Sequence, residues 1–127
     1  MSFITVDLRS RKQLSEQLID NVKDLILRGE LMPDDKLPSV RSLAKELGIN
    51  PNTIQKAYSE LERSGVIVTL QGRGSIVAAD EKSLRGEKSE QLKKKLAALV
   101  KEAACIGMTH DEFFDCAERS WCEDDKN

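Results

Sequence analysis

The sequence predicts a mainly α-helical protein with one small β-hairpin, followed by a short tail of two helices. Apolar residues recur at helical spacing in three segments before residue 65, and two β-branched runs then flank a glycine-rich turn. After residue 78 the chain becomes charged and then shows a leucine repeat. Its 127 residues suit one ordinary domain, or a small domain with an appendage.

Composition excludes several classes of protein. The chain is 39% hydrophobic, 33% charged and 4% aromatic, so aliphatic side chains must supply the core. No apolar run approaches the ~20 residues that span a bilayer, and no signal-peptide pattern opens the chain. Three cysteines cannot all pair within one chain. We therefore expect a cytoplasmic protein without membrane association.

Net charge is −2 overall, but it is unevenly distributed. Residues 1–78 carry +1 and residues 79–127 carry −3, whereas residues 38–74 carry +2. The middle of the chain is thus weakly electropositive.

Three helices are expected first. One covers about 11–28, and a second covers 40–47 with Ser39 as its N-cap. A third begins at Pro51 with Asn50 as its N-cap, because proline favours the first helical position.

A hairpin follows, with strands at 66–70 and 75–78. This order of elements, together with the spacing of Ala44, Gly48 and Ile54, predicts a winged helix-turn-helix over residues 1–78. Such a unit offers its third helix to the major groove of double-stranded DNA.

The local sequence resembles a known family. The stretches Leu37-Pro38-Ser39-Val40-Arg41, Leu43-Ala44 and Leu47-Gly48-Ile49-Asn50-Pro51-Asn52-Thr53-Ile54 resemble GntR-type bacterial transcription regulators. The resemblance covers about residues 8–78. The Asn-Pro-Asn-Thr entry and the short tail are similar to the YtrA-like subgroup. Gln55 departs from the family, in which many members have arginine at that position.

The resemblance implies a set of DNA-contacting residues at the second helix, the third helix and the hairpin tip, here called the wing. Asn50 and Ser39 are equally explained as helix caps, and Thr53 as a residue that hydrogen-bonds its own helix. Tyr58 is expected in the core. The DNA-contacting set is Ser39, Arg41, Asn50, Asn52, Thr53, Gln55, Lys56, Gln71, Gly72, Arg73 and Gly74.

The tail, residues 79–127, is expected to form helices at about 83–105 and 110–122, with 80–90 either a linker or a solvated helix start. Its apolar residues could pack on their own winged domain or pair with a second copy. The family resemblance and the symmetry of operators favour a homodimer. The proposed dimerisation residues are Leu92, Leu96, Leu99, Ala103, Ile106, Phe113, Phe114 and Trp121.

Other functions find little support. Cys105, His110, Cys116 and Cys122 lack the spacing of zinc ligands, so we expect no metal and no cofactor. No nucleophile has a supporting base by motif, so we expect no catalytic residues and no enzyme. The 49 residues of the tail are too few to enclose a ligand pocket of roughly 300 Å³ alone, although a ligand could lodge between subunits.

The sequence therefore predicts a dimeric, sequence-specific transcription regulator that binds a palindromic operator. Repression is what the family resemblance implies. The alternative is a winged-helix module for protein interaction or DNA architecture. No effector is identified.

Overall fold

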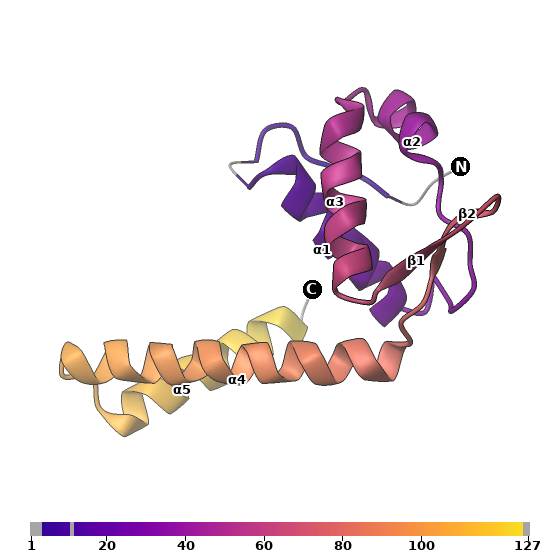
Figure 1. Ribbon diagram of the computed structural model, residues 1–127. Helices are drawn as coiled ribbons and strands as arrows, with labels where there is room; N and C mark the ends of the chain where they lie inside the picture. The colour runs from indigo at the N-terminus through magenta and orange to yellow at the C-terminus, as the bar shows by residue number, and fades with distance from the viewer. Residues whose placement is uncertain (1–3, 11, 126–127) are drawn as a thin grey trace. The chain divides into compact units, whose positions relative to one another are not determined.

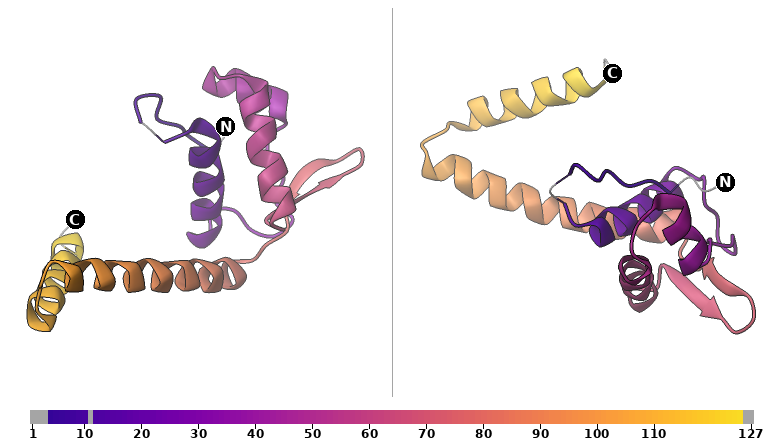
Figure 2. Two further views of the ribbon diagram at one scale, coloured as in Figure 1. Left: turned by 60° about the vertical axis from the view of Figure 1, so that its left-hand side comes forward. Right: turned by 90° about the horizontal axis from the view of Figure 1, so that it is seen from above.

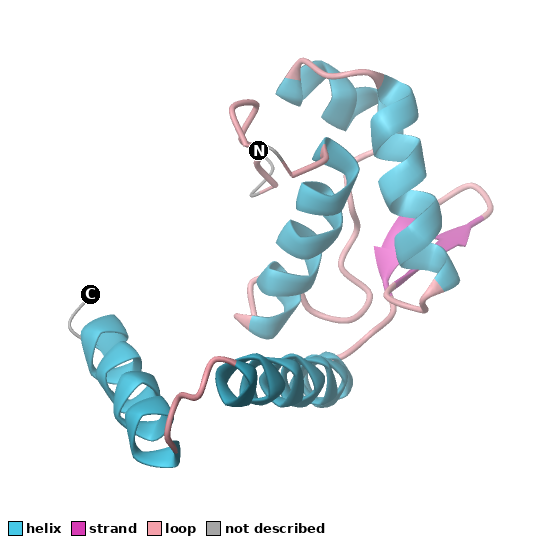
Figure 3. Cartoon of the chain, turned by 90° about the vertical axis from the view of Figure 1, so that its left-hand side faces the viewer, coloured by secondary structure: helices cyan, strands magenta, loops and turns pink. Residues whose placement is uncertain are grey.

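The computed structural model describes residues 4–10 and 12–125, and it confirms the mainly α-helical architecture with one hairpin (Figures 1 and 3). The chain divides into two compact units, Met1–Gly86 and Glu87–Asn127. The elements are α1 (Leu14–Leu27), α2 (Val40–Leu47), α3 (Pro51–Arg63), β1 (Ile67–Leu70), β2 (Gly74–Val77), α4 (Glu81–Cys105) and α5 (His110–Asp125).

The core of the first unit lies between α1, α2, α3 and the hairpin. The predicted apolar face of each helix is buried there, because aliphatic side chains at spacings of three and four share one side of a helix. α1 packs directly against α3, and α2 packs across α3. The buried helical residues include Leu18, Val22, Leu25, Ile26, Leu43, Ala44, Ile54, Ala57, Tyr58 and Leu61.

α1 begins three residues later than predicted, at Leu14. The side chain of Gln17 explains the delay, because it ties the preceding arm to the helix. Its Nε2 donates to the carbonyl oxygens of Asp7 and Lys12, at 3.1 and 2.9 Å, and its Oε1 accepts from the backbone N–H of Asp7 at 2.7 Å. Residue 11, the predicted start, lies outside the described residues.

The hairpin is antiparallel, with Ile67 opposite Val77 and Leu70 opposite Gly74. It projects from the helices of the first unit (Figure 2). A feature that the sequence did not predict is a further ladder on β2, made by residues 34–37. The N–H of Leu37 donates to Ser75 O at 2.9 Å, and that of Val77 donates to Asp35 O at 2.8 Å. The base of the wing is therefore held on both edges of β2.

Residues 80–90 were predicted to be either a linker or a solvated helix start, and the structure shows that α4 begins there, at Glu81. Asp80 Oδ1 accepts from the backbone N–H of Ser83 at 2.7 Å, which caps the helix. Leu84, on the next turn, is 4% exposed and belongs to the core of the first unit. The first turns of α4 thus complete the core of the winged unit.

The second unit contains the rest of α4 and α5, joined by a turn in which Gly107 has φ 77°. Thr109 Oγ1 accepts from the backbone N–H of Glu112 at 3.1 Å, as a capping sequence predicts. Among the residues described, none of the helices combines the length and the apolarity needed to cross a bilayer.

Candidate DNA interface

The turn between α2 and α3 is built from local signals. Ser39 Oγ accepts from Ser42 N at 3.1 Å and caps α2, while Gly48 ends it at φ 68°. Asn50 Oδ1 accepts from Asn52 N at 2.8 Å and caps α3. Glycine is favoured at positive φ, because other residues are strained there. These caps fix the start of α3 and confirm both predicted cap roles.

One face of α3 is left exposed and polar. Ile54, Ala57, Tyr58 and Leu61 are buried, whereas Asn52, Gln55, Lys56 and Ser59 are exposed. Their spacing of three, four and seven residues places the exposed four on one side of the helix. Thr53 is half-buried. The predicted recognition residues therefore lie together on an accessible surface, with the positive end of the helix dipole beside them.

The two glutamates further along α3 are engaged by their own chain. Arg63 Nε donates to Glu60 Oε2 at 3.0 Å, and this hydrogen bond holds the pKa of Glu60 below its ordinary value. Glu62 Oε1 accepts from the backbone N–H of Thr69 on β1 at 3.2 Å. Glu60 is thus paired with Arg63, and Glu62 is bonded to the hairpin. Both lie at the opposite end of α3 from Asn52.

The wing tip is exposed and consists of Gln71, Gly72 and Arg73, with Gly74 at the start of β2. The N–H of Arg73 donates to Leu70 O at 3.0 Å and closes the turn. Gly72 and Gly74 have φ 80° and 74°, so the turn requires glycine on both sides of the arginine. The predicted arginine is held at the tip of a short, tight hairpin.

The cations of this surface are available to a ligand. Arg41, Lys56 and Arg73 take part in none of the ion pairs found among the described residues. By contrast, Lys12, Arg28 and Arg63 each lie beside a carboxylate. Unneutralised cations around an exposed polar helix are suited to a phosphate backbone.

Two features of this surface were not predicted from the sequence. Ser59 Oγ accepts from Gln55 Nε2 at 3.1 Å, which orients the Gln55 amide. The i, i+4 spacing of the two residues could have revealed this contact. The second feature is the backbone pairing of residues 34–37 with β2, because Pro33, Asp34 and Asp35 indicate only a turn.

The second unit exposes its apolar residues. Leu92, Leu96, Leu99 and Phe114 are each more than half exposed, and Ile106 and Trp121 are 77% and 75% exposed. Ala103 and Phe113 are half-buried. We call these eight residues, which are the predicted dimerisation residues, the tail surface.

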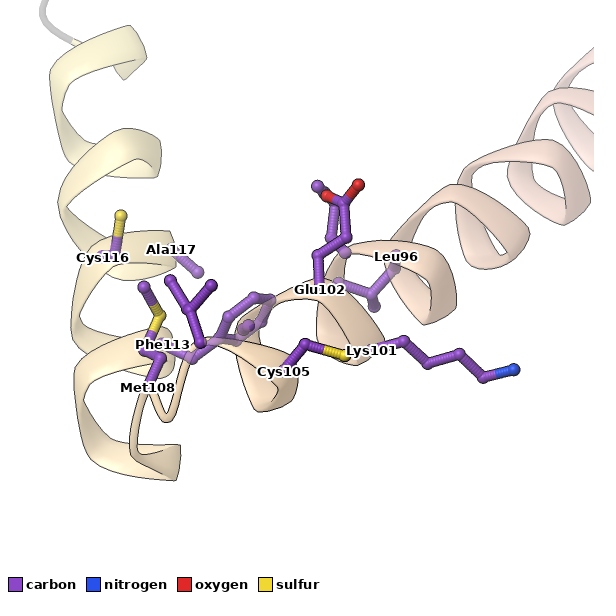
Figure 4. A pocket seen from close by; sticks show the side chains of 11 residues that line it. Leu96, Lys101, Glu102, Cys105, Met108, Phe113, Cys116 and Ala117 are labelled. Atoms are coloured by element: carbon purple, nitrogen blue, oxygen red, sulfur yellow. The ribbon is translucent and has the colours of Figure 1, made fainter.

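An open groove of about 890 Å³ lies between α4 and α5 of the second unit (Figure 4). It is apolar, because its lining comes largely from the tail surface together with Met108, Cys105, Cys116 and Ala117. The three cysteines are free and exposed. Within the part of the chain that the structure describes, no three histidine, cysteine or acidic side chains gather closely enough to share a metal ion.

Comparison with known proteins identifies the family. The family model of bacterial regulatory proteins, gntR family, matches residues 14–77. The HTH-type transcriptional repressor YtrA of Bacillus subtilis (strain 168) is 44% identical over 106 residues, covering 83% of this chain and 82% of that protein. A relative of this identity and coverage supports the YtrA-like subgroup.

Solved structures support the same conclusion. A transcriptional regulator from Oenococcus oeni has a TM-score of 0.75 at 28% identity, covering 91% of this chain and 97% of that chain. AraR(DBD) in complex with operator ORE1 has a TM-score of 0.51 at 26% identity, covering 61% and 95%. YtrA and the Oenococcus oeni protein are both transcription regulators, which agrees with the expectation of a non-enzymatic protein. The chain belongs to the GntR family of bacterial transcription regulators, in its YtrA-like subgroup, and carries a winged helix-turn-helix DNA-binding domain.

Proposed function

We propose that this protein is a sequence-specific repressor that binds a palindromic operator as a homodimer in the cytoplasm. The observation that carries the proposal is the exposed face of α3, where Asn52, Gln55 and Lys56 lie near the positive end of the helix dipole. Support also comes from relatives, since YtrA is a repressor and AraR(DBD) was crystallised with its operator.

Each part of the surface has a distinct role in this proposal. The amides of Asn52 and Gln55 pair with adenine in the major groove, and Lys56 reaches guanine acceptors or phosphate. Backbone N–H groups at the start of α2 bind phosphate, together with the side chains of Ser39, Arg41, Asn50 and Thr53. The wing residues Gln71, Gly72, Arg73 and Gly74 approach the minor groove or the backbone.

The tail surface is proposed as the dimer interface, because exposed apolar residues of this size need a partner. Charge favours a second copy of the chain as that partner. From Glu87 to Cys105 the sequence carries five lysines and three glutamates, whereas α5 carries seven acidic residues and one arginine. A two-fold pair can therefore set the acidic α5 of each chain near the basic part of α4 of the other, around a common apolar centre.

Selection of bound sequences from random duplexes, using the full-length protein, tests the proposal. We expect enrichment of an inverted repeat with half-site centres about 34 Å apart, one turn of DNA. Affinity for the selected duplex should fall as KCl is raised. In vitro transcription from a promoter that overlaps this sequence should decrease when the protein is added.

Three outcomes would contradict parts of the proposal. The absence of any enriched sequence favours the alternative, a protein-docking or architectural module. A single unrepeated half-site contradicts the dimeric operator. Increased transcription contradicts repression while leaving DNA binding intact.

A further inference from the structure

The segment at residues 34–37 brings a lysine to the wing. Lys36 forms an antiparallel bridge with Ile76 of β2, and the flanking hydrogen bonds of Asp35 and Leu37 hold its backbone in place. Paired residues on neighbouring antiparallel strands carry their side chains on the same face of a sheet. Lys36 therefore shares a face with Ile76 and, two residues further along β2, with Gly74.

The side chain of Lys36 extends toward the wing tip. Its Cε lies 3.8 Å from the point at which Gly74 would carry a Cβ, so the aliphatic stem packs against the glycine that follows Arg73. The residue is exposed. Lysine commonly packs its stem on a surface while its ammonium group stays in water.

The ammonium group of Lys36 is not neutralised by a neighbouring carboxylate. It takes part in none of the ion pairs of the described residues. The adjacent Asp35 is engaged in its own turn, where Oδ2 accepts from Met32 N at 2.8 Å. A cation outside any ion pair of the described residues thus lies beside the proposed DNA-contacting tip.

We propose that Lys36 is a further DNA-contacting residue, which binds a phosphate of the backbone next to the groove that the wing enters. The inference rests on the proposed DNA-binding role of the wing and adds a contact from a segment outside the helix-turn-helix. Lys36 contributes affinity without base preference, because a phosphate contact carries no sequence information.

The salt dependence of binding separates this role from a structural one. Each phosphate neutralised by a cation contributes about 0.9 to the slope of log K against log [KCl]. A variant that loses one such contact should bind about eight-fold more weakly than the wild type at 0.1 M KCl, if the two proteins have equal affinities at 1 M KCl. A residue that only stiffens the wing leaves the slope unchanged.

The experiment uses the full-length protein, the selected duplex and a scrambled duplex of equal length, over four KCl concentrations. Lys36→Gln should lower the slope by about 0.9 on both duplexes, and Lys36→Arg should retain the wild-type slope. Lys23→Gln is the matched control, because Lys23 on α1 lies near Glu60, at the end of α3 away from Asn52. It should retain the slope.

The outcomes are distinguishable. If the wild-type protein binds with the expected salt dependence and Lys36→Gln shows the same slope, the inference is overturned and the proposed function stands. If the wild type binds neither duplex, the proposed function itself fails. Thermal unfolding of each variant should match the wild type, and a lowered slope accompanied by early unfolding of both Lys36 variants would also overturn the phosphate role.

Discussion

The hydroxyl of Tyr58 on α3 donates a 2.7 Å hydrogen bond to the carbonyl oxygen of Pro38, the residue before the N-cap of α2. Burial raises the pKa of Tyr58, so the phenol stays protonated as a donor over the physiological range. The bond joins the entrance of α2 to the middle of the proposed recognition helix. It thereby links the two parts of the surface that we assign to DNA.

Tyr58→Phe should lower the free energy of unfolding by about 1 kcal/mol, because the Pro38 carbonyl loses its partner. Chemical denaturation measures the change. Tyr58→Leu, which also removes part of the ring packing, should cost more. Equal stability of Tyr58→Phe and wild type would show that this hydrogen bond is not needed for the fold.

Arg73→Ala should weaken operator binding by about 1–3 kcal/mol and leave the melting temperature nearly unchanged, because the side chain is exposed at the wing tip. Titration of a labelled duplex at fixed salt measures the effect. Arg28→Ala, at the exposed end of α1, removes an equal charge and serves as the control. Unchanged affinity of the Arg73 variant would remove the wing tip from the mechanism.

Gln55→Ala should relax specificity at one base position, since an amide can recognise adenine through a donor and an acceptor. Ser59→Ala should produce a weaker form of the same change, because Ser59 orients the Gln55 amide. Binding to all single-base variants of the operator gives the profile. A profile identical to that of the wild type for Gln55→Ala would refute the assignment.

Asn50 can be tested separately as a cap and as a DNA contact. Asn50→Ala should destabilise the protein by about 1 kcal/mol. Asn50→Asp keeps a good cap at the positive end of α3, so stability should be retained, but its charge repels phosphate. We therefore expect lost affinity at wild-type melting temperature, and equal affinity of Asn50→Asp would leave Asn50 as a cap alone.

Leu96→Asp combined with Leu99→Asp should convert a dimer to a monomer, with a rise in the dissociation constant on the order of a hundredfold or more, because a buried unpaired charge is costly. Ala98→Asp, exposed on the same helix but off the leucine repeat, is the control. Sedimentation of the protein at tens of micromolar distinguishes the dimer from the monomer. A wild-type protein that sediments as a monomer would contradict the interface.

The effect of truncating the chain should depend on where the cut falls relative to the boundary between the two units. Because Leu84 lies in the core of the first unit, removal of residues 87–127 should leave a folded monomer, whereas a cut after residue 79 should lower its stability. Burying a leucine contributes about 2 kcal/mol, which thermal unfolding of the two truncated chains can resolve. A shortened chain that still dimerises would move the interface out of the tail.

Local chemistry made much of this molecule predictable. α2 lies at the predicted residues, because Ser39 at its start and Gly48 at its end are strong boundary signals within one short segment. α3 begins at the predicted Pro51 for the same reason. The exposed face of α3 followed from helical periodicity, which needs no information from the rest of the chain.

Contacts between distant residues depended on the folded chain. Lys36 meets Ile76 about 40 residues further along, and neither residue carries a signal of that pairing, because ladder hydrogen bonds use backbone groups common to all residues. The charged sequence around Leu84 indicated a tail, whereas in the structure Leu84 is buried in the core of the winged unit. The sequence was therefore sufficient for the order of the elements, the caps of α2 and α3, and the polar face of α3. The partners of Lys36, Tyr58 and Leu84 emerged only when packing brought separate segments together, since such contacts arise from chain closure and shape complementarity rather than from local pattern.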